Sequence, residues 1–319
     1  MVLNDKYAGF DVRRGMYIFL TAGVVLYVLM LVISHLGWIL VDVSLLEESR
    51  IYLIDMIYNV LAIFFGVAII WTYITVLRIH KFPLGRLTPI FIIYFLMTQI
   101  LFIEWIIGLS ATEVLGFEEI SLARPLLGFI GGIMLLVGYI FYLYRELTLR
   151  VTGSVMLLIG VILIYFVGVG VNSSWYLRII ASLGDYVTYE SSEELFRPHL
   201  LGLVFHPTFE AISLLLAVLT AILYAFPEYR KGVFRIFILV ILAVDVLLFS
   251  IALMWDSVVC IVLAKETGFY QDLSTVEQIG FIIVTFGYIL GLVGGIFLML
   301  GTIFAIGTML SKYQALSEG

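Results

Sequence analysis

Long apolar runs separated by short polar segments dominate the 319-residue chain. Each run holds about 20 residues or more, and a helix of that length, rising 1.5 Å per residue, crosses a hydrocarbon core of roughly 30 Å. The runs centre on residues 16–41, 51–77, 88–110, 125–145, 152–175, 198–226, 233–260 and 278–310. The pattern predicts an all-α integral membrane protein with eight transmembrane helices.

Composition supports this fold class. Apolar residues make up 63% of the chain and charged residues 13%, with a mean hydropathy of +1.17, which lies outside the range of soluble domains. The first apolar run is too long for the core of a signal peptide, so we expect it to remain as a helix. The single cysteine, Cys260, excludes an internal disulfide and a cluster held by several cysteines.

The distribution of basic residues predicts the orientation. Placing the N-terminus in the cytoplasm leaves only five of the 17 lysines and arginines outside, namely Arg50, Arg124, Arg178, Arg197 and Lys265. Both termini are therefore predicted to be cytoplasmic, in a multi-pass protein of the plasma membrane. The outer connections are acidic and the net charge is −6, which disfavours nucleic acid as a partner and leaves membrane lipid as the expected surroundings.

The chain also resembles itself. Three segments of the first half align with three of the second: 23–38 with 160–175, 50–59 with 197–206, and 90–99 with 236–245. Both copies begin on the cytoplasmic side, so the alignment predicts a parallel 4+4 duplication. We expect residues 1–150 and 151–319 to form two four-helix bundles side by side.

Polar side chains recur at similar depth in several helices. By the helical rise, they lie roughly 6 to 12 Å below the predicted outer surface. The members of this layer are His35, Asp55, Asn59, Glu104 and Asp256. Ionisable groups at membrane depth usually face a bundle interior or a wet cavity and mark proton, ion or substrate paths.

A second set of polar residues lies along one stripe of the sixth predicted helix. His199, His206 and Glu210 fall along one face. At 100° per residue, His206 lies 20° to one side of His199 and Glu210 lies 20° to the other side. His206 is roughly 12 Å deep by the same rise, whereas Glu210 lies near the midplane, as does Asp245 on the next helix.

These residues suit several chemistries. His35 and His206 could ligate a b-type haem from two helices, and His206 with Glu210 could contribute to a metal site with Glu104 or His35. A quinol pocket needs a histidine and a carboxylate to bind the headgroup oxygens and accept their protons. His35, Asp55, Asn59 and Glu104 satisfy that requirement within the first bundle.

Two short motifs carry a family resemblance. YIFLTAG at 17–23 and PLGRLTP at 83–89, together with eight helices in a 4+4 arrangement, resemble the NrfD-like membrane subunits of polysulfide-reductase-type complexes. Thr21 and Ala22 replace the family's paired glycines, and Pro83 replaces its aspartate. The resemblance implies a membrane anchor that exchanges electrons between a quinone near the outer surface and an extracytoplasmic iron-sulfur partner, without binding haem. By position, His35 matches the family's quinone-site group on the first helix.

We therefore expect a quinone-handling subunit of a respiratory electron-transfer complex, with an iron-sulfur or other redox protein as its partner. His35 would contact a quinone oxygen, Asp55 or Glu104 would accept a proton, and Glu210, Asp245 and Asp256 would extend a proton path. The alternatives are a b-type haem cytochrome subunit, a proton- or cation-coupled secondary transporter and a scaffold without chemistry. The sequence predicts no metal site beyond the His206 and Glu210 spacing.

Overall fold

The computed structural model describes residues 12–45, 51–79, 84–111, 123–164, 209, 212–230, 232–268 and 273–317. Within these ranges every regular element is helical. The elements are α1 (Val12–Leu45), α2 (Ile51–Ile79), the 3-10 helix η1 (Leu84–Leu87), α3 (Thr88–Ala111), α4 (Ala123–Tyr142), α5 (Leu147–Val161), the shorter helix Ile212–Ala225, the 3-10 helix η3 (Pro227–Arg230), α8 (Gly232–Gly268) and α9 (Thr275–Ser317). The all-helical prediction is confirmed for this part of the chain.

Seven of the described helices are long and apolar enough to cross a membrane. The sixth predicted span, 198–226, is described only in part, by Phe209 and the helix Ile212–Ala225, so the count of eight stays a prediction. Large apolar side chains remain on the outside of the bundle, including Trp71 at 64% exposed and Ile282 at 68%. Such an exterior suits lipid as the solvent and supports a multi-pass membrane protein.

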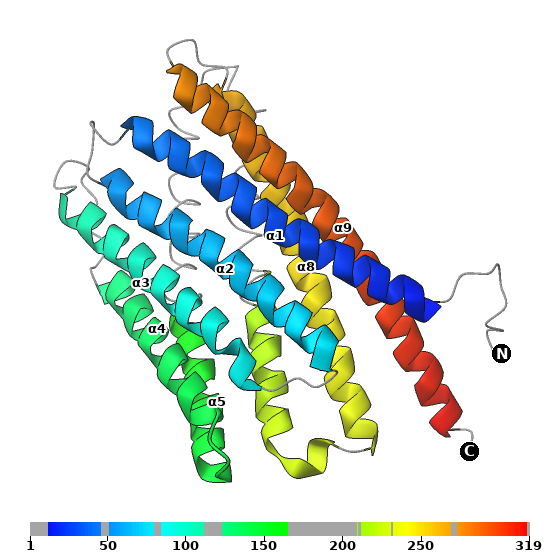
Figure 1. The fold of residues 1–319 in the computed structure, drawn as a ribbon. Coiled ribbons are helices and arrows are strands. Elements are labelled where there is room, and N and C mark those ends of the chain that lie inside the picture. The colour runs from blue at the N-terminus through cyan, green and yellow to red at the C-terminus, as the bar shows by residue number, and fades with distance from the viewer. Residues whose placement is uncertain are drawn as a thin grey trace, which may run out of the picture.

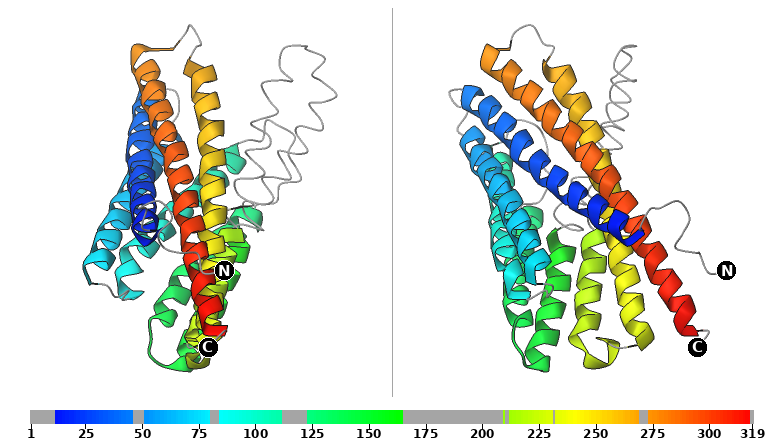
Figure 2. Two further views of the ribbon diagram at one scale, coloured as in Figure 1. Left: turned by 90° about the vertical axis from the view of Figure 1, so that its right-hand side faces the viewer. Right: turned by 45° about the vertical axis from the view of Figure 1, so that its right-hand side comes forward.

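The first and last helices lie side by side. Figure 1 shows α1 antiparallel to α9, with α2 on its other flank and α8 behind, and contacts between successive helices continue from α2 through α3 and α4 to α5. In both views of Figure 2, α1 begins and α9 ends toward the same end of the bundle. Among the described helices, the most extensive contact, between α1 and α9, joins the two predicted halves, and their division at residue 150 stays a prediction.

Glycines explain the close approach of α9 to α1. Gly280, Gly287, Gly294 and Gly301 recur every seven residues and all face α1. Seven residues return a helix to within about 20° of the same face, so the four glycines form one stripe. A Cβ atom at Gly287 would lie 2.6 Å from the Ser34 backbone nitrogen. Backbones can approach this closely only where small residues line the contact.

Two further glycines of α9, Gly291 and Gly295, contact α8. Gly295 faces Met254 on α8, and Gly291 lies against both Ser257 of α8 and Met30 of α1. Gly287, Gly291 and Gly295 form a GxxxGxxxG pattern in the sequence, and the structure divides it between the contacts with α1 and α8.

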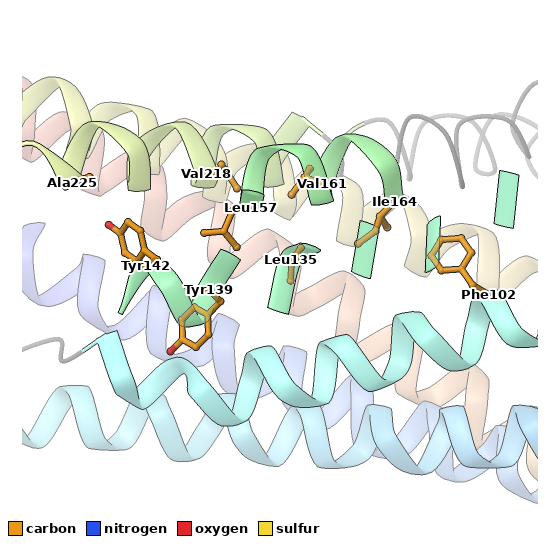
Figure 3. Packing of buried hydrophobic residues seen from close by; sticks show 9 residues of the cluster. All are labelled: Phe102, Leu135, Tyr139, Tyr142, Leu157, Val161, Ile164, Val218 and Ala225. Atoms are coloured by element: carbon orange, nitrogen blue, oxygen red, sulfur yellow. The ribbon is translucent and has the colours of Figure 1, made fainter. Parts of the chain in front are cut away.

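Helices α4 and α5 pair in the same way. Gly131 and Gly138 on α4 meet Gly160 and Gly153 on α5, and a Cβ atom at Gly138 would lie 2.8 Å from the Gly153 carbonyl oxygen. Their apolar side chains continue toward α3 and the helix Ile212–Ala225, as Figure 3 shows for the cluster around Leu135.

The α1–α9 contact predicts how glycine substitutions affect stability. Gly287→Ala places a methyl group against the Ser34 backbone, and overpacking of this kind costs about 1–3 kcal/mol. Gly307→Ala is the matched control on the same helix, because no atom lies within 4 Å of its added methyl. Thermal unfolding in detergent should show a lower midpoint for the first variant only. Equal midpoints would contradict the close backbone contact.

Candidate functional site

A cavity of about 710 Å³ lies among α1, α2, α3, α8 and α9. It is lined by the second half of α1, the first half of α2, the middle of α8 and the start of α9, and so lies toward the end of the bundle opposite the one where α1 begins. Besides five tyrosines, its ionisable and amide side chains among the described residues are His35, Asp42, Asp55, Asn59 and Asp256.

A hydrogen-bond chain runs along one wall of this cavity. The Asn59 amide nitrogen donates to Asp42 Oδ2 at 2.8 Å, and Asn59 Oδ1 lies 2.7 Å from His35 Nδ1. Because that amide oxygen can only accept, the ring donates through Nδ1. The neutral imidazole then has Nε2 as its acceptor, so Asp42 and Asn59 together fix the tautomer of His35.

Helical spacing brings these groups together. His35 and Asp42 are seven residues apart on α1, and seven residues complete almost two turns, so both side chains share a face. Asp55 and Asn59 are four apart on α2 and share a face for the same reason. The α1–α2 contact brings the two faces together, and Asp256 joins them from α8.

The wall is buried and acidic. Asp42 is 6% exposed and Asn59 7%, so each needs the partner that it has. Among the described residues that line the cavity, three are aspartates and none is lysine or arginine. The cavity therefore offers proton acceptors, and hydrogen bonds along its wall join Asp42 to Asn59 and Asn59 to His35.

Aromatic rings form much of the remaining surface. Tyr58 lies edge-on to His35 with ring centroids 6.3 Å apart, and Trp38 packs edge-on against Phe281 at 5.8 Å. Tyr52 also lines the space. A flat, partly polar ring would find both stacking partners and hydrogen-bonding groups here.

A second cavity, of about 460 Å³, adjoins the first. Tyr27, Phe65, Tyr94 and Phe249 line both. The rest of its wall is aliphatic and aromatic except for Asp245 and Ser213, whose hydroxyl donates a hydrogen bond to the Asp245 carboxylate.

Four of the five residues of the predicted layer, His35, Asp55, Asn59 and Asp256, line the first cavity, and their role stays a prediction. Asp245, which was predicted near the midplane, lies in the second cavity. Glu104 is on α3, but its side chain is outside the described residues, as are His199, His206 and Glu210. The geometry of the haem pair and of the His206 metal site therefore lies outside the described part of the chain.

Asp42 was missed by the sequence interpretation. It lies near the predicted end of the first apolar run, where a lone aspartate is typical of a helix end at the interface. Its seven-residue separation from His35 was the available signal. Within the described ranges, no three histidine, cysteine, aspartate or glutamate side chains are grouped so that they could hold a metal ion.

Comparison with known proteins identified no relative: no family model, no curated protein and no solved structure matches the chain. The resemblance to NrfD-like subunits therefore stays a prediction from two motifs and a helix count.

The hydrogen-bond chain predicts the effect of removing its central residue. Asn59→Ala leaves Asp42 and His35 without this partner, and a buried polar group left unsatisfied costs about 1–3 kcal/mol. Thr152→Ala is the control, because its hydroxyl bonds to the Thr148 carbonyl of its own helix at an exposed site. Chemical unfolding in detergent should separate the two variants. Equal losses of unfolding free energy in the two variants would mean that the hydrogen-bond chain contributes no more to stability than an ordinary surface hydroxyl.

Proposed function

We propose that the protein is a quinone-handling subunit of a respiratory electron-transfer complex and that the 710 Å³ cavity binds the quinone headgroup. One observation carries the proposal. A histidine with a fixed tautomer stands beside carboxylates in a cavity that is otherwise largely aromatic and aliphatic. A quinol headgroup needs this combination, because it is a flat ring with two hydroxyl groups that must lose their protons as electrons leave.

The proposed reaction assigns a destination to each proton and electron. One hydroxyl of the bound quinol donates its proton to His35 Nε2, and the other donates its proton to Asp55 or Asp256. The two O–H bonds break, the ring becomes a quinone, and two electrons pass to a redox partner subunit of the iron-sulfur class. Asn59 and Asp42 are positioning residues that hold the His35 ring ready to accept.

The membrane arrangement completes the proposal. Eight helices in a 4+4 arrangement, with both termini on the cytoplasmic side of the plasma membrane, would put the cavity near the outer surface. The start of α1 and the end of α9 lie toward one end of the bundle, which supports a common side for the two, and the distribution of basic residues favours the cytoplasm as that side. Protons released from the cavity would then reach the outer side, where the redox partner would also dock.

Quinone binding provides the direct test of this role. Trp38 lines the cavity, so a bound quinone should quench its fluorescence in protein reconstituted into nanodiscs. His35→Gln should weaken binding at least tenfold, corresponding to about 1.4 kcal/mol. His80→Gln is the matched control, because the sequence places His80 in a cytoplasmic connection.

Absence of saturable quenching in the wild-type protein would contradict the quinone proposal. A dithionite-reduced minus oxidised spectrum of the same sample tests the haem-bearing alternative. A stoichiometric b-type band that disappears in His35→Ala would replace the haem-free assignment with a cytochrome.

A proton-coupled secondary transporter is a second candidate, favoured by the carboxylates in both cavities. Asp256 and Asp245 are eleven residues apart on α8, or roughly 16 Å along the axis, and so lie at two depths of the same helix. Carboxylates placed in this way could carry protons along the bundle.

The Asp245 carboxylate distinguishes the two functions. In a transporter, Asp245→Asn would abolish solute-driven proton movement in liposomes, whereas in a quinone subunit it would leave headgroup binding within about twofold of wild type. The Ser213→Ala variant, which removes only the hydrogen bond to Asp245, serves as control. Proton movement driven by a solute gradient and lost in Asp245→Asn would favour the transporter.

A further inference from the structure

The second cavity has no role in the proton and electron transfer described above. Residues of α1, α2, α3, α4, α8, α9 and the helix Ile212–Ala225 all contribute to its wall, so it lies centrally in the bundle. Among the described residues that line it, only Asp245, Ser213 and two tyrosines carry polar side-chain groups. Asp245 and Ser213 are paired with each other.

This wall suits an apolar chain better than water. The cavity volume of about 460 Å³ is many times the roughly 30 Å³ that one water occupies in the liquid, yet a buried water needs two to four polar partners. Asp245 and Ser213 lie together at one place in the wall, and the two tyrosines lie where the cavities adjoin, so the rest of the described wall offers water no polar side chain. An aliphatic chain would contact the remaining aliphatic and aromatic side chains throughout.

The two cavities adjoin through aromatic side chains. Tyr27 packs edge-on against Phe249 with centroids 5.3 Å apart, and the ring centroids of Phe65 and Tyr94 are 6.1 Å apart. All four line both cavities, so a molecule in one touches the same rings as a molecule in the other. On α1 the combined wall runs from Val24 to Asp42, which is roughly 27 Å of helix.

We propose that the second cavity receives the apolar chain of a polyprenyl quinone whose headgroup occupies the first. This assignment rests on the proposed function, since it needs a headgroup beside His35. It adds the substrate class: the protein selects long-chain quinones over headgroups that lack a tail. The polar wall holds the ring, the aromatic pairs contact the first part of the chain, and the aliphatic wall contacts the part that follows.

The test compares a polyprenyl quinone with a tail-less quinone of the same ring in nanodiscs. Each affinity is expressed as a mole fraction of quinone in the bilayer, so that the different partitioning of the two quinones into lipid does not affect the comparison. The wild-type protein should bind the long-chain compound at least tenfold more tightly. Ala217→Phe, which adds a ring to the wall of the second cavity and narrows it, should abolish that advantage and leave tail-less binding within about twofold. Leu219→Phe is the control, because Leu219 lies on the same helix with an exposed side chain that does not line the cavity.

Each result separates the two proposals. Wild-type protein that binds neither compound overturns the proposed function, whereas equal affinity for both overturns only the tail assignment. An advantage that survives Ala217→Phe also overturns it. If Ala217→Phe fails to fold, Leu214→Phe probes the same wall. A free fatty acid that competes equally with the polyprenyl compound would assign the cavity to a lipid acyl chain and overturn the tail assignment.

Discussion

The close contact between α1 and α9 is the constraint on which the candidate site depends. In a bilayer, apolar side chains gain little by leaving lipid for protein, so helix association depends on close packing and hydrogen bonds. The glycines at 280, 287, 294 and 301 allow the backbone of α9 to reach that of α1. This contact fixes the position of α1, and with it the face that carries His35 and Asp42. Helix α8 also packs on α9 and brings Asp256 to the same space.

Three members of the polar wall of the first cavity, His35, Asn59 and Asp42, can lie at membrane depth because they satisfy one another. Asn59 can donate and accept at once, so it joins a carboxylate to an imidazole ring. An aliphatic residue at this position would leave two buried polar groups to find other partners. The hydrogen-bond chain thus has a structural and a chemical role: it links α1 to α2 and presents a histidine with a defined proton acceptor toward the cavity. The adjoining apolar cavity extends the site from a polar end to an apolar one, which suits an amphiphilic ligand.

The fold was more predictable from the sequence than the site. Apolar runs identified the helices because the thickness of a bilayer sets their length, and depth along each helix placed His35, Asp55, Asn59 and Asp256 at one level. Depth cannot show which helices are neighbours, so the separate cavity around Asp245 could not be foreseen. The seven-residue glycine stripe is present in the sequence, but the shorter GxxxG spacing is the more familiar signal. Asp42 was overlooked because a single aspartate near a helix end is common, and only the fold brings it to Asn59.

The central claim is that a quinone ring lies beside His35. Labelling with a photoreactive quinone, followed by mass-spectrometric mapping of the modified peptides, tests this claim most directly. The account predicts labels on α1 near His35 and on the facing part of α2 or α8, all suppressed by excess unlabelled quinone. Labels confined to lipid-facing positions such as Trp71, and unaffected by competitor, would contradict it.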